Sequence, residues 1–344
     1  MSTKASDVPW RDTRAPLSDS ARVRVWKLNV ILTVLVAAAV VFSIVAGKVW
    51  LPWDAWSSSD PRWLIIAELR FPRTVLALAV GAALGVSGAA MQGYLRNPLA
   101  DPGLFGISHG GALGAVISLY FGYAASAVIL PFFALGGAAG AMLILALLAG
   151  RSGSLILFAL AGMMLASIAG ALTTLVLSLA PTPFVASEIL NWLMGALTDR
   201  SWDDVHITVP AMIVGAVLLG FAAPSLDALT LGEQAARSMG VNPRRLQWLI
   251  VLGVGCCVGA SVAAAGAIGF VGLMVPHIIR PLAGARPSVI LFPSALAGAL
   301  LVLLADSLVR IAPTVSELHL GVAMAMLGGP FFLSMLIRMR RSIA

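Results

Sequence analysis

Charge is what this chain has least of. Asp, Glu, Lys and Arg make up 11% of its 344 residues, whereas soluble domains carry about 25%. Hydrophobic residues make up 60%, and the mean hydropathy is +0.97. So few charged side chains cannot cover the water-facing surface of a protein of this length. The composition therefore excludes an ordinary soluble protein and predicts one large membrane domain.

Catalytic and metal-binding motifs are also scarce. The chain has two cysteines, Cys256 and Cys257, and because they are adjacent in an apolar run they predict neither a disulfide nor a metal site. The only Gly-Lys pair, Gly47-Lys48, lacks the upstream glycines of a phosphate-binding loop. No local motif suggests a nucleophile with its base. We therefore expect no catalytic residue, no bound metal and no cofactor, which argues against a membrane enzyme.

Four histidines are scattered without metal-ligand spacing, and His109 falls inside an apolar run. A buried, hydrogen-bonded side chain is the favoured interpretation of His109, and a role in a transport pathway stays open. Carboxylates are missing from the centres of the apolar runs, where ion-coupled transporters usually place them. This argues against a secondary transporter working alone, so a transporter of this kind would take its energy from another chain.

Apolar runs long enough to cross a bilayer as a helix recur along the sequence. We expect about ten transmembrane helices, over Leu28–Ala46, Thr74–Gln92, Leu104–Gly122, Ser126–Ala149, Leu155–Leu179, Val205–Ala223, Leu246–Ala267, Ile268–Ala283, Val289–Ala305 and Leu318–Ile337. Glycines at four-residue spacing, such as Gly110 with Gly114 and Gly136 with Gly140, predict close helix packing in lipid.

Basic residues predict the topology. With an even number of spans both termini lie on one side, and 16 of the 22 Lys and Arg residues then share that side. The positive-inside rule makes it the cytoplasm, so we expect an inner-membrane protein with both termini cytoplasmic. Residues 1–27 form a basic cytoplasmic tail, and residues 28–344 form the transmembrane domain. Because the basic residues lie in short loops and at the termini, they do not indicate nucleic-acid binding.

Two stretches interrupt the apolar pattern. Residues 96–103 carry Pro98 and Pro102, which cannot continue a helix. Irregular backbone at membrane depth is tolerated inside protein or beside a water-filled path, so a pathway role is favoured over a plain turn. Residues 225–247 form the longest cytoplasmic connection, in which two short helices are expected, over Asp227–Leu231 and Glu233–Met239. A loop of this length with its own helices usually docks a partner.

These stretches resemble the FecCD-type permeases of ABC importers. The resemblance rests on Leu69–Arg73, on Arg96–Gly103, on Leu231–Gly240 and on Gly269–His277, and it continues to Ala305-Asp306 and Arg310. It runs in order from about residue 65 to the C-terminus. It implies a large (type II) importer permease of ten spans, in which spans two to five and seven to ten form an inverted repeat.

The resemblance also implies roles for particular residues. Arg70, Arg73 and Arg310 match periplasmic arginines that pair with acidic residues of a substrate-binding protein, the alternative being arginines that anchor spans to lipid headgroups. Asn97 and Leu99 match a constriction of the pathway, and Ser154 is a looser match to a second one. The coupling helix that docks on the ATPase corresponds to the segment that contains Gly232, Glu233, Ala236 and Gly240.

In that family two identical permeases pair with two cytoplasmic ATPase subunits and a periplasmic binding protein, and only the ATPases use ATP. The expected cargo is a metal chelate, with an iron-siderophore or other iron complex ahead of haem and cobalamin. The alternatives are an ion-independent secondary transporter and another ABC-class transport subunit, such as part of an exporter.

Overall fold

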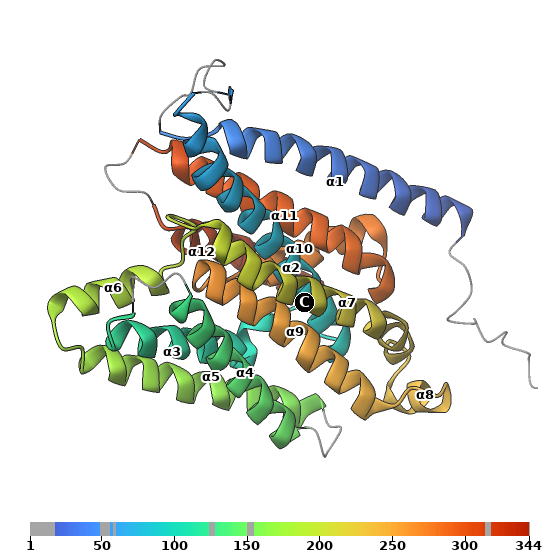
Figure 1. The fold of residues 1–344 in the computed structure, drawn as a ribbon. Helices are drawn as coiled ribbons and strands as arrows, with labels where there is room; N and C mark the ends of the chain where they lie inside the picture. The colour runs from blue at the N-terminus through green and yellow to red at the C-terminus, as the bar shows by residue number, and fades with distance from the viewer. Residues whose placement is uncertain are drawn as a thin grey trace, which may run out of the picture.

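The computed structural model describes residues 18–48, 56–57, 60–123, 128–149, 155–313 and 318–343. All regular structure in these ranges is helical, which confirms the predicted all-α fold (Figure 1). The helices are α1 (Asp19–Val45), η2 (Ile65–Arg70), α2 (Phe71–Leu95), η3 (Pro102–Phe105), α3 (Ile107–Tyr120), α4 (Ile129–Ala149), α5 (Leu155–Ser178), α6 (Pro183–Leu193), α7 (Trp202–Leu229), α8 (Glu233–Ser238), α9 (Pro243–Ala265), α10 (Val271–Ala283), α11 (Pro287–Ile311) and α12 (Leu320–Ile343).

Each of the ten predicted spans corresponds to one of these helices. Eight helices in the described ranges are long and apolar enough to cross a membrane. The other two, α3 and α10, have 14 and 13 residues and are apolar but short. Both helices follow a stretch of irregular backbone. They are short because that stretch takes up residues that would otherwise extend the helix.

Three features differ from the sequence-based expectation. The α1 helix begins at Asp19, where the Ser18 side chain accepts a hydrogen bond from the Ala21 backbone N–H, so residues 19–27 of the predicted tail are helical. The predicted separate helix Asp227–Leu231 is wrong, since α7 continues to Leu229. The connection between α7 and α9 is therefore shorter than residues 225–247. Third, α6 is an additional short helix that the span pattern missed.

The α2 and α9 helices form the centre of the bundle. Of the residues in the apolar, membrane-spanning stretch of each helix, 83% and 78% are buried. Glycines allow α2 to approach its neighbours backbone to backbone: Gly81 lies against the carbonyl of Gly298 on α11, and Gly88 against that of Gly272 on α10. The predicted packing through Gly136 and Gly140 is wrong, because both face open space.

The helix lengths repeat along the chain. A long buried helix, an interruption, a short helix and two long helices occur in that order as α2–α5 and again as α9–α12. Both short helices start after a residue in the left-handed region, Gly106 before α3 (φ 77°) and Phe270 before α10 (φ 68°). One further long helix, α7, separates the two sets, so the second set enters from the opposite end. This is the order that an inverted repeat requires.

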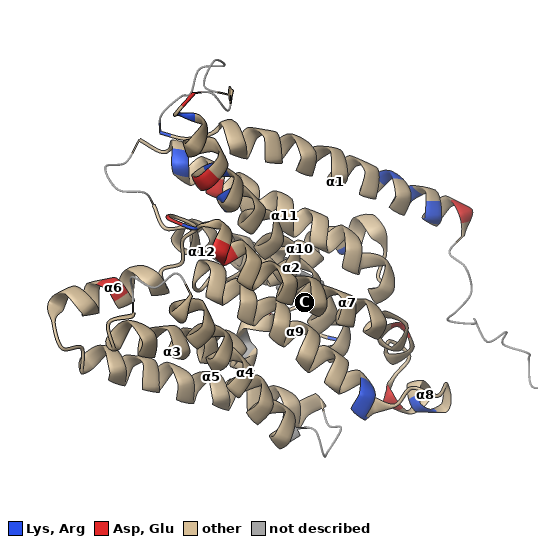
Figure 2. Cartoon of the chain, in the orientation of Figure 1, with Lys and Arg blue, Asp and Glu red and all other residues tan. Residues whose placement is uncertain are grey.

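Most Lys, Arg, Asp and Glu residues lie toward the two ends of the bundle, with other residues between them (Figure 2). The basic start of α1, α8 and the start of α9 lie at one end, which we call the α8 end. The other end carries η2, α6 and the start of α7 (Figure 1), and we call it the η2 end. A large part of the lateral surface is exposed leucine, isoleucine, valine and phenylalanine, as expected for a surface in contact with lipid.

Candidate functional site

The two interrupted segments meet around a cavity of about 370 Å³. One wall is residues 99–103 with Ser108 and His109, and the other is residues 267–273. Most of the lining is apolar, and Asp101 and His109 are its ionisable side chains. Non-helical backbone at membrane depth needs protein or water around it, and here the two interrupted segments lie on either side of one cavity. The pathway role of residues 96–103 stays a prediction.

Local hydrogen bonds hold the first interruption in shape. Arg96 ends α2 in the left-handed region (φ 50°), and the Asn97 side-chain Oδ1 accepts from the Leu99 backbone N–H at 2.9 Å. Asp101 Oδ1 then accepts from the Gly103 N–H at 2.6 Å and begins η3. Of the two predicted gate residues that the structure describes, Leu99 lines the cavity and Asn97 fixes the turn that presents it. Ser154 lies outside the described residues.

A buried glutamine joins the end of α2 to α10 beside this cavity. The Gln92 side-chain Nε2 donates to the carbonyls of Gly272 and Leu273 at 3.3 and 3.2 Å, and its Oε1 accepts from Arg280 at 3.1 Å. Gln92 thereby satisfies two carbonyls of the first turn of α10. Sequence reasoning assigned this side chain no role, and a single glutamine in a Gly/Ala-rich span is the signal that marks it.

His109 differs from its favoured interpretation. Its side chain is exposed and lines the cavity, so the expectation that it is buried is wrong. Its position one helical turn from the left-handed Gly106 places it at the cavity wall. No group of three or more His, Cys, Asp or Glu residues that could hold a metal ion occurs within the described part of the chain.

At the η2 end, one buried carboxylate serves two arginines. Asp306 on α11 has no exposed surface and accepts from Arg73 Nε at 3.0 Å and Nη2 at 2.9 Å. Arg310 Nε lies 3.1 Å from the other Asp306 oxygen as an ion pair. Arg310 also donates to Ser43 Oγ at 2.7 Å and to the Ala46 carbonyl at 3.2 Å. The cluster thus fastens α1, α2 and α11 together.

Arg70 is held by the end of α1 instead. Its Nη1 donates to the carbonyls of Ile44 and Val45 at 3.0 and 2.8 Å. The last carbonyls of a helix have no partner within the helix and carry its negative dipole end, so they suit a guanidinium. The structure therefore brings all three predicted docking arginines together. Arg70, Arg73 and Arg310 are 7%, 8% and 4% exposed, and their docking role stays a prediction.

The turn before η2 carries a further charged pair at this end. Asp60 accepts from the Arg62 side chain at 2.7 Å and from its backbone N–H at 2.8 Å. The side-chain bond, with the backbone bond, lowers the pKa of Asp60 to about 2. Asp60 is therefore ionised throughout the physiological pH range.

At the α8 end, one side chain of α8 is buried. Ala236 is buried and is the contact through which α8 rests on the bundle, whereas its neighbours Gln234, Arg237 and Ser238 are exposed. Gly232 begins the helix with φ 104° and ψ 158°, a conformation that is essentially restricted to glycine. Gly240 follows it with φ 85°. The four predicted coupling residues therefore form one compact unit.

Exposed apolar side chains flank this unit. Leu231 and Met239 are 54% and 40% exposed on either side of α8, outside the transmembrane helices. Apolar side chains that are exposed beside polar ones are typical of a surface that binds another protein. Together with the glycine-defined turns, they make α8 the best candidate for a partner contact on the described surface.

Asp306 and α6 are the features that sequence reasoning used least. Asp306 and Arg310 are four residues apart, a spacing that places them on one helix face. Thr182 accepts from the Val185 N–H and is followed by Pro183, which is a helix-start signal. Both signals are present in the sequence, but a search for apolar runs long enough to cross a bilayer does not detect them.

Comparison with known proteins agrees with this architecture. Residues 34–338 match the model of the FecCD transport family. The Fe(3+) dicitrate transport system permease protein FecD of Escherichia coli (strain K12) is 36% identical over 91% of this chain and 99% of its own. The vitamin B12 import system permease protein BtuC of Salmonella typhi is 38% identical, over 92% of this chain and 96% of its own.

Solved structures show the same arrangement of helices. An inward-facing structure described as a metal-chelate type ABC transporter superposes with a TM-score of 0.83 at 30% identity, over 91% of this chain and 99% of that one. PsaBC from Streptococcus pneumoniae, solved with a Fab, has a TM-score of 0.51 at 19% identity over 76% and 88% of the two chains, a likeness of fold only. Because the family model, the relatives and the fold agree over most of its length, this chain belongs to the FecCD transport family.

Proposed function

We propose that this chain is the membrane-spanning permease subunit of an ATP-driven importer for a metal chelate. The observation that carries the proposal is α8, a short exposed helix flanked by Leu231 and Met239 at one end of a bundle of family-typical architecture. Its place suits a coupling helix that transmits movement from a separate ATPase. The chain works in this scheme as a homodimer with two ATPase subunits, and only those subunits use ATP.

The α8 end is cytoplasmic in this proposal. The basic residues of this end, which include Arg237, Arg244, Arg245 and Arg286, favour the cytoplasmic face of an inner membrane. The η2 end then faces the periplasm and the substrate-binding protein. Its arginine cluster holds three arginines and one aspartate, so it has a formal excess of two positive charges. We propose that this excess attracts an acidic docking surface mainly through its field, since the guanidinium groups are buried in this conformation.

The transport cycle follows from these positions. ATP-driven closure of the partner subunits moves α8, and α7 and α9 carry that movement into the bundle because they flank α8 in the chain. The cavity between the two interruptions changes its access, with Leu99 at its wall. Among metal chelates we propose an iron complex as cargo, as for the FecD relative, with cobalamin, as for the BtuC relative, as the alternative.

Substituting Gly240→Trp in the coupling unit is expected to abolish the response of the partner ATPase to loaded binding protein. A left-handed residue resists any L side chain, and the indole would occupy the surface that the ATPase needs. The measurement is ATP hydrolysis by the reconstituted complex, with Glu233→Ala as a milder companion. Gly284→Trp is the matched control, because Gly284 also has a positive φ (103°) and open surroundings at the same end.

The importer assignment fails if folded protein associates with no ATPase subunit. Uptake that persists when every ATPase partner is deleted would instead favour a secondary transporter. An equal loss of the ATPase response in Gly240→Trp and Gly284→Trp would mean that α8 is not part of the coupling path. The family membership would be unaffected.

Substituting Leu99→Trp is expected to reduce transport at least tenfold while the protein remains folded. The larger side chain would fill part of a cavity of about 370 Å³ at the junction of the two interruptions. Uptake of a labelled ferric chelate and of labelled cobalamin by the reconstituted complex measures the effect and identifies the cargo. Leu35→Trp on the exposed surface of α1 is the control, and it should transport normally. Undiminished uptake in Leu99→Trp would place the pathway elsewhere.

A further inference from the structure

Phe270, which precedes the first residue of α10, combines a strained backbone with a large side chain. Its φ is 68°, in the left-handed region, where a bulky side chain is disfavoured. Its carbonyl accepts from the Met274 N–H at 2.8 Å, so this conformation also starts the helix. Strained residues persist only where the surrounding structure compensates for them, and they are common at functional sites. The phenyl ring must therefore make contacts that offset the strain.

The corresponding position in the first half of the chain is Gly106. It precedes α3 with φ 77°, so the turn itself needs no side chain. A Cβ at Gly106 would lie 2.9 Å from Leu165 Cβ and 3.0 Å from the Ala166 nitrogen, because α5 packs closely there. In the second half α12 takes the place of α5 and leaves room for a ring. The ring of Phe270 is therefore not required by the architecture that the two halves share.

This ring lies in a notch of α12 that Gly328 forms. A Cβ added to Gly328 would collide with the Cβ and the ring of Phe270, and Gly328 is itself buried. Phe332 is one turn farther along α12 and lines the cavity of about 370 Å³ together with Phe270. The contact between Phe270 and Gly328 therefore forms a seam between α10 and α12 at the wall of this cavity.

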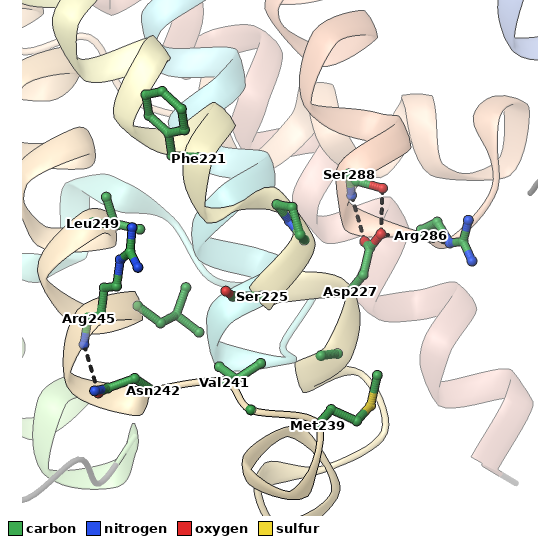
Figure 3. A pocket seen from close by; sticks show the side chains of 14 residues that line it. Phe221, Ser225, Asp227, Met239, Val241, Asn242, Arg245, Leu249, Arg286 and Ser288 are labelled. Atoms are coloured by element: carbon green, nitrogen blue, oxygen red, sulfur yellow. Dashed lines mark hydrogen bonds and ion pairs between the residues drawn. The ribbon is translucent and has the colours of Figure 1, made fainter. Parts of the chain in front are cut away.

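The neighbours of α12 are fastened more firmly than α12 itself. Gln92 ties the start of α10 to α2. Asp227 ties the end of α7 to the start of α11, because it accepts from the N–H and Oγ of Ser288 at 2.8 and 2.6 Å beside a cavity at the α8 end (Figure 3). In the apolar stretch of α12, 22% of the residues are buried, against 83% in the span that contains α2. The seam therefore opens most easily by movement of α12.

We propose that Phe270 is a gate of the transport path, closed when its ring lies in the Gly328 notch and open when α12 moves away. The gate rests on the proposed importer function, since it needs a cargo that crosses the cavity. In the closed state the contact with α12 offsets the left-handed strain of Phe270. When the contact is lost, the strain favours a helical conformation, which would extend α10 at its start. The gate thus has two distinct states, as switching elements in packed proteins do.

The test is the amount of cargo moved per ATP hydrolysed by the reconstituted complex, with labelled ferric citrate and labelled cobalamin as probes. Gly328→Ala places a methyl group where the ring lies, so the gate stays open and cargo returns through it. The ratio should fall about tenfold, a typical effect of overpacking on an equilibrium between two states. Gly329→Ala is the matched control and should keep the wild-type ratio, because a Cβ there meets no atom within 4 Å.

Phe270→Ala should lower the ratio as Gly328→Ala does, because it removes the ring. The double variant should be no worse than Phe270→Ala, since the added methyl group then has no ring to displace. Phe331→Ala removes a ring of the same size from another contact of α12 with α10, where the rings of Phe331 and His277 lie 5.9 Å apart. In this variant uptake and hydrolysis should change together, which leaves the ratio unchanged.

A purely structural role for Phe270 predicts that uptake and hydrolysis fall in parallel in Gly328→Ala and Phe270→Ala, and that outcome would refute the gate. Equal ratios in Gly328→Ala and Gly329→Ala would also refute it, while the importer function would stand. A wild-type complex without ATP-driven uptake would refute the importer function, and the gate with it.

Discussion

Substituting Asp306→Asn is expected to destabilise the protein by about 3–5 kcal/mol, the cost of removing one partner from a buried ion pair. Asp306 has no exposed surface and is the carboxylate shared by Arg73 and Arg310. The variant would leave two buried guanidinium groups without their counter-charge. An asparagine oxygen could still accept one hydrogen bond, but it carries no charge, so the loss falls on the electrostatic part of the interaction.

Unfolding of the purified protein in mixed denaturing micelles measures this effect. Asp203→Asn is the matched control, because Asp203 is an exposed carboxylate at the same η2 end and its loss should cost little. We also expect the contact of α1 with α11 to loosen, since Arg310 joins the end of α1 to this cluster. A cost below about 1 kcal/mol would mean that the guanidinium groups reach water or headgroups without rearrangement of the bundle.

Substituting Gly88→Ala is expected to destabilise the protein by about 3 kcal/mol, the upper part of the range for overpacking. A Cβ at this position would collide with the carbonyl and Cα of Gly272 on α10. Glycine-to-alanine changes in helices normally stabilise by about 1 kcal/mol, so a loss here has to come from this contact. Gly272 also packs against Pro102 of η3, so separation of α2 from α10 would distort the cavity and reduce transport.

The control for Gly88→Ala is Gly136→Ala on α4, where a Cβ meets no atom within 4 Å. This variant should be neutral or slightly stabilising in the same unfolding measurement. If both variants were equally stable, α2 and α10 would have to lie farther apart than the structure places them, and the glycine would then serve helix flexibility instead of close packing.

Much of the fold could be predicted because lipid imposes a simple rule on sequence. A span needs about 20 apolar residues as a helix, so ten such runs gave ten helices with only local errors in their ends. The errors have physical causes. The α7 helix continues past its apolar stretch to Leu229 with Pro224 inside it, because neighbouring groups can compensate for the hydrogen bond that a proline removes from a membrane helix. The α6 helix is too short to cross a membrane.

The candidate sites were predictable in part. The interruption at residues 96–103 and the coupling segment could be located because proline and glycine leave a local signal. The sequence could not indicate that Leu99 faces the second interruption, since residues 99 and 270 are brought together only by the packing of α2 and α10. His109 was misassigned for the same reason, because a helical pattern shows which residues share a face but not what that face meets.

The sequence by itself determined that this protein lies in a membrane, where its apolar helices run, where its chain is interrupted and which family it resembles. These properties depend on composition and on the order of neighbouring residues, and both can be read along the chain without knowing how the helices pack. Only the tertiary structure decided that Asp306 neutralises Arg73 across 233 positions of chain, and that Gly88 and not Gly136 is a contact between helices. Such properties depend on which helix faces which, and that choice is made by the packing of the whole bundle.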